Sequence, residues 1–399
     1  MQTHRVDIFI SGGGIAGQVA ACVFATQGFT VLMADPVPPV TVADMDGSDL
    51  RSTAFLKPAR ELFDRCGLWP VLAPHAKPLD SLQVIDTTGW PPVERDRRVF
   101  RASDMGDDPF GWNLMNWVVR RELWTHLQGQ DRITALYGAG FKSIVQRTGE
   151  IIVSLTNGDQ VRARMGVAAD GKFSPLREAV GIDVSTTRYG QKSLAFTVTH
   201  DAPHDNISTE IYNEGGPFTI VPLPDLDGRH ASAIVWMNLG ARAVELMDMP
   251  VPAFEDVMQN RSVNLLGRMR LEGRRSIWPI ITQTADHLVS GRVAVMAEAA
   301  HALPPIGAQG LNTSLNDLAV LADLAGKSPD DLGGVKMMQA YEKTRKPDIA
   351  ARARVIDVFN RVARSGETPL QALRLAGLKA VHDMPPLRKG VMRAGLGPR

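Results

Sequence analysis

A glycine-rich turn close to the start of the chain restricts its fold more than any other feature. Residues 6–10, rich in β-branched and aromatic side chains, lead directly into Gly-x-Gly-x-x-Gly, and residues 15–27 then place apolar side chains at helical spacing. In this setting the first glycine permits a tight turn, the second lets the backbone approach a pyrophosphate, and the third lets helix and strand pack closely. The helix N-terminus offers unpaired N–H groups to the phosphates. We therefore predict a dinucleotide site, with contacts from Gly12, Gly14, Ile15, Ala16 and Gly17.

The second strand of this unit ends in an acidic residue. Residues 30–34 form a mostly apolar run, and Asp35 follows at the position where a carboxylate accepts hydrogen bonds from an adenosine ribose. A solvated aspartate at the end of a strand is the alternative interpretation. Because a carboxylate disfavours a ribose with a 2′-phosphate, the predicted pocket suits FAD and does not suit tightly bound NADP.

Length and composition exclude several classes of protein. With 399 residues, 44% of them hydrophobic, the chain is long enough for two packed lobes. Lys and Arg number 44 and Asp and Glu 43, so the net charge of +1 gives no field to attract nucleic acid, which we exclude as a partner. Cys22 and Cys66 have neither metal-ligand nor disulfide spacing, so we predict reduced core thiols, a cytoplasmic protein and no metal site. No stretch reaches the roughly 20 apolar residues of a spanning helix, which leaves only peripheral membrane contact.

Strand and helix signals divide the chain into two lobes. Strands are expected at residues 81–86, within 133–169, where Asn157-Gly158 marks a hairpin, and through 192–237. Helices are expected at residues 54–66, 117–128, 311–324, 335–364 and 369–382, and residues 90–98 are interpreted as a loop. We predict an α/β protein whose Rossmann-like FAD-binding domain is discontinuous and whose substrate domain is an inserted antiparallel β-sheet. The expected bounds are 1–80, 100–180 and 285–345 for the FAD-binding domain, 81–99 and 181–284 for the substrate domain, and 346–399 for a C-terminal helical segment.

Two later segments have the character of a binding site. Residues 166–177 repeat the order strand, turn and helix, with Asp170-Gly171 at the turn. Residues 297–301 read Ala-Glu-Ala-Ala-His, and a helix is expected to begin near Gln309. Such a helix directs its positive end towards the pyrimidine edge of a flavin and favours the anionic reduced ring. For His301 we predict a supporting role, because no nucleophile arrangement lies beside it in the sequence.

The three segments, in this order and at this separation, resemble those of the class A flavoprotein monooxygenases. An Asp-Gly motif with a following Ser and Arg contacts FAD in that family and takes part in handling the nicotinamide cofactor; Asp170-Gly171, Ser174 and Arg177 match it. The later family motif normally reads Gly-Asp-Ala-Ala-His, then Pro and Gly-Gln-Gly. Here Ala297 and Ala308 replace glycines and Glu298 replaces the aspartate, which alters contact distances to the ribityl chain and pyrophosphate.

The resemblance implies a set of FAD contacts from the two later segments and from two arginines. Asn312 is equally explained as a first-turn helix residue, and either arginine as a solvated surface residue, since Lys and Arg are frequent in this chain. The implied contacts are Arg51, Arg120, Asp170, Gly171, Glu298, Pro305, Gly307, Ala308, Gln309, Gly310, Leu311 and Asn312.

Over nearly its whole length the chain is similar to the ubiquinone biosynthesis hydroxylases within that class. This resemblance implies a fold like that of p-hydroxybenzoate hydroxylase, of the glutathione reductase type. It implies that NAD(P)H reduces FAD, that molecular oxygen adds to give a flavin hydroperoxide, and that the distal oxygen is transferred to an activated phenol ring. Because the cofactor carries this chemistry, no side-chain acid or base is predicted. The likeness rests on residues 51–54, 66–69, 112–120, 304–317, 385–388 and 395–398.

The same resemblance implies a polyprenylated aromatic substrate and a place near a membrane. Candidates for an apolar substrate pocket are Phe218, Ile220, Val221 and Trp236 on the inserted sheet, for which ordinary sheet core is the alternative. Residues 369–393 interleave leucines with basic side chains, a pattern that suits peripheral contact with the inner face of the cell membrane. A helix packed on the flavin lobe is the alternative there. A ubiquinone-biosynthesis complex is a further implied partner.

Three functional hypotheses follow. The leading one is an FAD-dependent, NAD(P)H-using hydroxylase of a polyprenyl phenol in ubiquinone biosynthesis. The second is a hydroxylase of a soluble aromatic compound in catabolism or secondary metabolism. The third is a non-catalytic flavoprotein subunit of a biosynthetic complex, suggested by the Ala297-Glu298 departure from the family motif.

Overall fold

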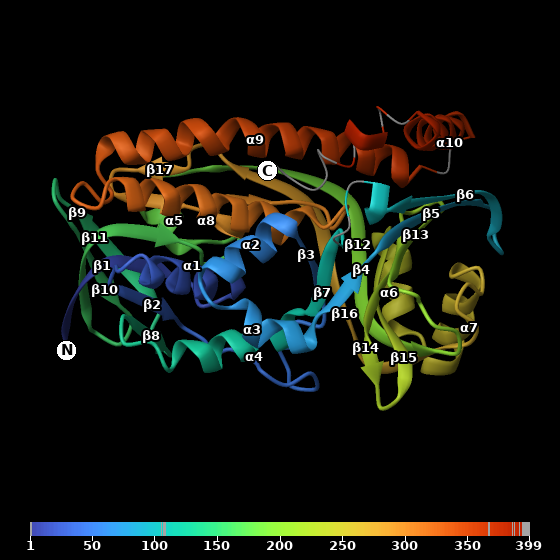
Figure 1. The fold of residues 1–399 in the computed structure, drawn as a ribbon, viewed down its shortest axis with the longest axis horizontal. Helices are drawn as coiled ribbons and strands as arrows, with labels where there is room; N and C mark the ends of the chain where they lie inside the picture. The colour runs from blue at the N-terminus through green and yellow to red at the C-terminus, as the bar shows by residue number, and fades with distance from the viewer. Residues whose placement is uncertain are drawn as a thin grey trace.

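The protein consists of two β-sheets side by side, with long helices running along one face of both (Figure 1). The computed structural model describes residues 2–104, 106, 109–365, 368–384, 386, 388–390 and 392, apart from the side chains of 368–370 and 372–373. Pro385, Leu387 and residues 395–398, on which part of the family resemblance rests, lie outside the described residues. The predicted α/β class is confirmed.

The first sheet is built around the parallel βαβ unit that the glycine-rich turn predicts. Strand β1 pairs in parallel with β2 and β11, and helix α1 (Ile15–Thr26) connects β1 to β2. The hairpin predicted at Asn157-Gly158 joins β10 to β11. In spatial order the strands are β17 (Val289–Ser290), β18 (Val293–Val295), β11 (Gln160–Ala168), β1 (Thr3–Ser11), β2 (Val31–Asp35) and β8 (Ile133–Tyr137). Off this order, β10 (Ile151–Leu155) pairs with β11, and β9 (Phe141–Gln146) pairs with β10.

The second sheet is mixed. Strand β5 pairs with β13 in parallel, whereas all the other neighbouring strands of this sheet pair antiparallel. The expected sheet was purely antiparallel, and the difference arises where the early segment, residues 81–101, adds to its edge. In spatial order its strands are β19 (His301–Ala302), β16 (Met269–Ala285), β12 (Val184–His200), β15 (Arg229–Leu239), β14 (Phe218–Leu226), β13 (Ile207–Tyr212), β5 (Ser81–Thr88) and β6 (Val93–Arg101). A small third sheet contains β3 (Ser52–Leu56), β7 (Gly111–Met115) and β4 (Lys77–Leu79).

Helices cover these sheets and enclose two main cores. The larger core lies around the first sheet and includes α8 and part of α9, and the smaller lies between the second sheet and α6 and α7. Cys22 and Cys66 are both buried and free. The helices not yet named are α2 (Lys57–Arg65), α3 (Trp69–Leu72), α4 (Asn116–Leu127), α5 (Pro175–Ala179), α6 (Gly240–Asp248), α7 (Val251–Arg261), α8 (Gln309–Lys327), α9 (Val335–Ala363) and α10 (Thr368–Asp383), with short 3-10 turns η1 (Ala73–His75), η2 (Ala102–Asp104) and η3 (Ala297–Ala299).

Two local predictions are wrong. The helix expected over residues 54–66 begins only at Lys57, because Ser52–Leu56 pairs with β7 as β3. The loop expected at residues 90–98 is largely strand β6, whose polar side chains suit the edge position next to β5. Helices α6 and α7 were not expected.

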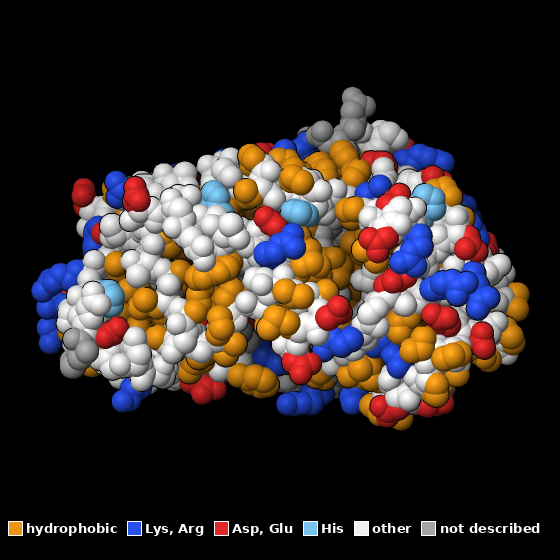
Figure 2. All heavy atoms as spheres, turned by 90° about the horizontal axis from the view of Figure 1, so that it is seen from below, with side chains coloured by type: hydrophobic (Ala, Val, Ile, Leu, Met, Phe, Trp, Pro, Cys, Tyr) orange, Lys and Arg blue, Asp and Glu red, His pale blue; other side chains and the backbone are white. Residues whose placement is uncertain are grey.

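The surface carries both charged and hydrophobic side chains. In the view from below, hydrophobic side chains lie between charged ones, and a group of them is found near the middle of the face (Figure 2). In the part of the chain that the structure describes, every helix is too short or too polar to cross a membrane.

Candidate functional site

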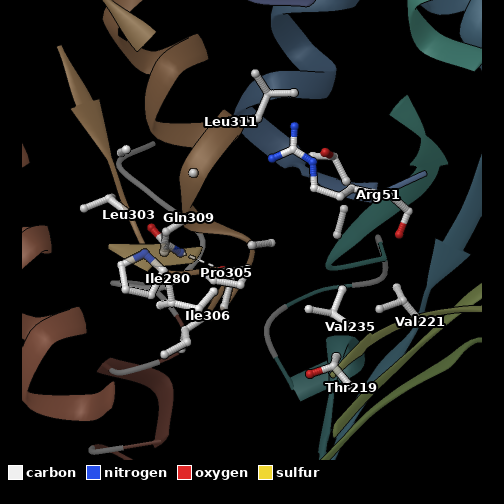
Figure 3. A pocket seen from close by; sticks show the side chains of 18 of the residues that line it. Arg51, Thr219, Val221, Val235, Ile280, Leu303, Pro305, Ile306, Gln309 and Leu311 are labelled. Atoms are coloured by element: carbon white, nitrogen blue, oxygen red, sulfur yellow. Dashed lines mark hydrogen bonds between the residues drawn. The ribbon is translucent and has the colours of Figure 1, made fainter. Parts of the chain in front are cut away.

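A large cavity of about 1510 Å³ lies between the two sheets. Its wall begins at Asp35 on the first sheet, passes Arg51 and the start of α8, and continues across the second sheet to α9 and α10. Residues from all three predicted segments line it. Figure 3 shows part of this wall, with Pro305 and Ile306 across the open space from Val221 and Val235.

The three motif glycines have different structural roles at the turn between β1 and α1. A Cβ at Gly12, whose φ is 109°, would lie 2.3 Å from the carbonyl oxygen of Ala169, and one at Gly17 would lie 1.9 Å from that of Gly12. Both glycines are therefore required by close packing. Gly14 has nothing within 4 Å of a built Cβ, and with Ile15 and Ala16 it lines the cavity. The first turn of α1, which has no side-chain cap, thus has open space for a pyrophosphate.

Asp35 lies at the end of β2, at the edge of the cavity. Its Oδ2 accepts a hydrogen bond from the Gly13 N–H at 2.7 Å, and its Oδ1 accepts one from the Val37 N–H at 2.8 Å. A carboxylate oxygen has room for a second donor. The position therefore fits the predicted contact with ribose hydroxyls.

Asp170 presents an unpaired acceptor. Its Oδ2 accepts hydrogen bonds from Ser11 Oγ at 2.7 Å and from the Leu176 N–H at 3.3 Å, whereas its buried Oδ1 has no partner among the described residues. Burial raises the pKa of this carboxyl group. Asp170 and Gly171 line the cavity. A ribityl hydroxyl would satisfy the orphaned oxygen, so this residue fits a flavin dinucleotide.

Ser174 and Arg177 support the Asp170 turn from behind. Ser174 caps α5 by accepting a hydrogen bond from the Arg177 N–H at 3.0 Å. The Arg177 guanidinium donates to the carbonyl oxygens of Ala299 and Lys172, at 3.0 and 3.1 Å. Both side chains are buried, so they hold the second and third motif segments together and do not face the cavity.

Arg51 and Arg120 both face the cavity and share one carboxylate. Arg51 donates to both oxygens of Asp49, through Nε and Nη2, each at 2.7 Å, and Arg120 Nη2 lies 3.9 Å from Asp49 Oδ2. Burial alone would raise the pKa of Asp49, but the two arginines and Asn116 hold it below its usual range. Sequence reasoning did not identify Asp49 as a functional residue, because its role appears only when β3 and α4 come together.

The third segment forms the opposite wall of the cradle. Helix α8 begins at Gln309, and its N-cap, Ala308, has a left-handed φ of 56° and no capping side chain. Gln309 is held in place, because its Nε2 donates to the Gly307 carbonyl oxygen at 2.9 Å and its Oε1 accepts from Arg352 at 2.6 Å. The cavity wall here consists of Glu298, Pro305, Gly307, Ala308, Gln309, Gly310 and Leu311. The uncapped N-terminal end of α8 therefore faces the cavity, and its contact with the pyrimidine edge of a flavin stays a prediction.

Asn312 differs from the expectation, because it lies behind this wall. Its Oδ1 accepts a hydrogen bond from the Leu56 N–H at 2.9 Å, and its Nδ2 donates to the carbonyl oxygens of Ala54 and Ala308, each at 2.7 Å. The side-chain amide of Asn312 thus makes all three of these hydrogen bonds with backbone groups. Asn312 fixes α8 against β3, which matches the structural alternative rather than a side-chain contact with flavin.

His301 belongs to a buried ionic cluster. Its Nε2 lies 2.6 Å from Asp317 Oδ2, and Arg345 Nε donates to Asp317 Oδ1 at 2.8 Å. Burial alone would raise the pKa of Asp317, but His301 and Arg345 lower it. This cluster ties β19, α8 and α9 together, in agreement with the supporting role predicted for His301.

The substrate-pocket prediction requires a correction on the second sheet. Side chains alternate along β14 and β15, so Phe218, Ile220 and Trp236 point away from the cavity and pack in the core against α7. Their place in the cavity wall is taken by Thr219 and Val235, and only Val221 of the four candidates lines the cavity. The cause is the presence of α6 and α7, which bury the opposite face.

These observations agree with comparisons with known proteins. The family described as "FAD binding domain" matches residues 5–355. A protein named ubiquinone hydroxylase UbiL from Rhodospirillum rubrum is 30% identical over 98% of this chain and 89% of its own length. The 3-demethoxyubiquinol 3-hydroxylase of Escherichia coli is 23% identical over all of both chains. The structure of p-nitrophenol 4-monooxygenase PnpA from Pseudomonas putida is similar in fold, with a TM-score of 0.79, 16% identity and full coverage of both chains.

The cofactor prediction is confirmed by the family match: FAD is the cofactor, NAD(P)H the electron donor and molecular oxygen the co-substrate. The resemblance to the ubiquinone biosynthesis hydroxylases is likewise confirmed by relatives that match over the whole chain. A non-catalytic role is not supported. The chain belongs to the FAD-binding domain family, and it is an FAD-dependent monooxygenase.

Proposed function

We propose that this enzyme hydroxylates the ring of a polyprenyl phenol in ubiquinone biosynthesis. The single observation that carries the substrate assignment is the apolar extension of the cavity beyond the flavin cradle. One side of this extension is the outer edge of the second sheet, with Leu82 on β5 and Phe100 on β6. The other side is α9 and α10, with Val358, Phe359 and Leu378. A ligand that combines an aromatic head with a long hydrocarbon tail matches this shape.

Two residues of α9 support a tail that leaves the cavity. The side chains of Val355 and Val358 line the cavity and yet are 69% and 63% exposed. Each isoprene unit of a tail that covered them would remove several CH₂ and CH₃ groups from water, each contributing about 0.8 kcal/mol. The tail therefore supplies binding free energy remote from the ring.

In this function the chain's own residues bind the cofactor, orient the substrate and exclude water from the site. The N-terminal end of α1 would hold the pyrophosphate, Asp35 the ribose, and Asp170 the ribityl chain, because all three line the cavity. When bound, FAD takes electrons from NAD(P)H and activates oxygen. The apolar wall keeps the reacting ring dry, which prevents unproductive loss of the activated oxygen.

Peripheral contact with the membrane is part of the proposal. A polyprenyl phenol resides in a bilayer, and α10 carries the exposed Lys379 directly after Leu378, which lines the apolar extension of the cavity. A liposome flotation assay with anionic vesicles, performed with the full chain and a form lacking residues 369–399, tests this contact. Equal flotation of the two forms contradicts it. Contact with other proteins of ubiquinone biosynthesis stays a prediction that rests on the family resemblance.

The function itself is tested by mass spectrometry of the quinone extract from cells that lack this chain. We expect a polyprenyl phenol short of one oxygen to accumulate, and to disappear when the wild-type chain is restored. The matched control is Gly14→Glu, which places a negative side chain where the pyrophosphate binds. Cells that receive this variant instead of the wild-type chain should still accumulate the polyprenyl phenol. An unchanged quinone pool in the absence of the chain would refute the ubiquinone assignment and favour a soluble aromatic substrate.

A further inference from the structure

A half-buried carboxylate faces the cavity from the second sheet. Glu210 lies in the middle of β13, opposite Val84 of β5 and Thr219 of β14, and Thr219 in turn lies opposite Val235 of β15. All four side chains line the cavity. Directly opposite residues of paired strands lie about 5 Å apart. Figure 3 shows Thr219 and Val235 across the open space from Pro305 and Ile306. Because Glu210 lies opposite Thr219 on the paired strand and also lines the cavity, it belongs to the wall that faces the flavin cradle.

The polar environment of Glu210 is incomplete. Tyr212 Oη donates a hydrogen bond to Glu210 Oε2, and no other hydrogen bond or ion pair to this carboxylate is found among the described residues. Burial raises the pKa of Glu210, and the hydrogen bond from Tyr212 offsets only part of that effect. A carboxylate that is partly removed from water and has no cation beside it is costly to keep unless it serves a ligand.

The neighbouring carboxylate, Asp86, has its negative charge balanced by cations. Asp86 lies on β5 opposite Tyr212, and it is paired with Arg374 at 2.6 Å and with Arg95. Its charge is therefore balanced by two guanidinium groups, whereas that of Glu210 is not. Among the titratable and charged groups near Glu210, Tyr212 on β13 donates to it, and Asp86 on β5 is paired with Arg95 on β6 and Arg374 on α10. Arg354 on α9 lines the same cavity, and Arg261 on α7 lies behind the sheet.

We propose that Glu210 is the catalytic base that receives the phenolic proton of the substrate, a role that rests on the proposed function. The O–H bond of the phenol breaks, its electron pair stays on the phenol oxygen, and a new O–H bond forms on the Glu210 carboxylate. The ring gains electron density, which an electrophilic oxygen needs. When the product ring regains aromaticity, the hydrogen of the hydroxylated carbon leaves to water and Glu210 returns its proton to the same oxygen. The proton transfers involve no change of oxidation state.

Glu210→Gln in the FAD-loaded full chain tests this role, with a phenol that carries one prenyl group as the probe. We expect unchanged flavin content and continued NAD(P)H oxidation, but a fall of about 10²–10⁴-fold in hydroxylated product, the usual contribution of general base catalysis. The wild-type rate should fall as pH drops through the pKa of Glu210, and the variant should lack this acid limb. Its residual rate should rise towards about pH 10, where a phenol ionises by itself.

Three further variants separate a catalytic role from a structural one. Tyr212→Phe should move the acid limb to higher pH, because it removes the hydrogen bond that lowers the pKa of Glu210. Glu210→Asp should keep an acid limb at reduced rate. Glu94→Gln, on β6 of the same sheet and outside the cavity, should behave as the wild type.

Two outcomes would overturn different conclusions. If Glu210→Gln retains the wild-type ratio of product to NAD(P)H and the same acid limb, Glu210 is not the base, and the proposed function stands. If the wild-type protein reduces its FAD but hydroxylates no phenol, the proposed function fails, and the role of Glu210 fails with it.

Discussion

At the scale of single residues, two alanines adopt a backbone conformation that glycine adopts more easily. Ala297 and Ala308 each have a φ of 56°, which costs an L-residue about 1–2 kcal/mol. Ala308→Gly should therefore raise the free energy of unfolding by about 0.5–1 kcal/mol, after the greater entropy loss of glycine is subtracted. Urea denaturation of the FAD-free wild type and variant measures this difference in the free energy of unfolding.

Ala297→Gly is the informative comparison for this prediction. The methyl group of Ala297 is buried in the larger core, and its removal costs about 0.8 kcal/mol, which cancels the relief of strain. This variant should be close to neutral. A loss of stability in Ala308→Gly would show that its φ is not a source of strain.

The residue scale also shows why the flavin cradle was easier to predict than the substrate wall. The roles of Gly12, Gly14 and Gly17 follow from backbone geometry within one turn, so the motif alone defines them. The alternation along β14 indicates two faces, but not which one meets the cavity. That choice depends on α6 and α7, which follow β15 and were not expected from the sequence. Asp49 and Glu210 were missed for the same reason, since their partners or surroundings come from other elements.

At the scale of elements, helix α8 is anchored by one buried carboxylate. Asp317 pairs with His301 of β19 and Arg345 of α9, and the pKa of Asp317 is lower in the folded than in the unfolded protein. Its pairs therefore stabilise the fold above the unfolded pKa of about 3.9 and are lost as pH falls through the folded pKa. Asp317→Asn should destabilise the protein at neutral pH by about 3–5 kcal/mol and reduce the loss of stability in acid.

Thermal or urea unfolding between neutral and acidic pH checks this prediction. Asp323→Asn is the matched control, because Asp323 lies on the same helix and makes only an exposed pair with Lys327. It should change stability by less than about 1 kcal/mol. Similar effects of the two substitutions would mean that the cluster does not anchor α8.

Elements were predicted best where the sequence signal was local. The βαβ unit and the hairpin at Asn157-Gly158 follow from spacing and turn residues, and both are confirmed. Strand β6 was mistaken for a loop because Glu94, Arg95, Asp96, Arg97 and Arg98 make it highly polar. Its strand conformation comes from pairing with β5, which no local pattern indicates.

At the scale of the whole molecule, the mouth of the cavity at α9 should select substrates by their tails. Val358→Asp places a charge on an exposed position, so the fold should be preserved. For a phenol with several isoprene units we expect kcat/KM to fall about tenfold or more, because the tail loses its apolar contact. An unprenylated phenol should be hydroxylated as by the wild type. Equal losses for both substrates would place the tail elsewhere.

The continuity of the cavity means that cofactor and substrate are not bound independently. The cradle for FAD and the wall that carries Glu210 enclose one space, so a bound flavin would itself form one side of the substrate site. The apoprotein then offers the phenol only half of its surroundings. By thermodynamic linkage, each ligand must strengthen the affinity for the other by the same factor. Cells that run short of flavin would therefore lose substrate capture as well as catalysis.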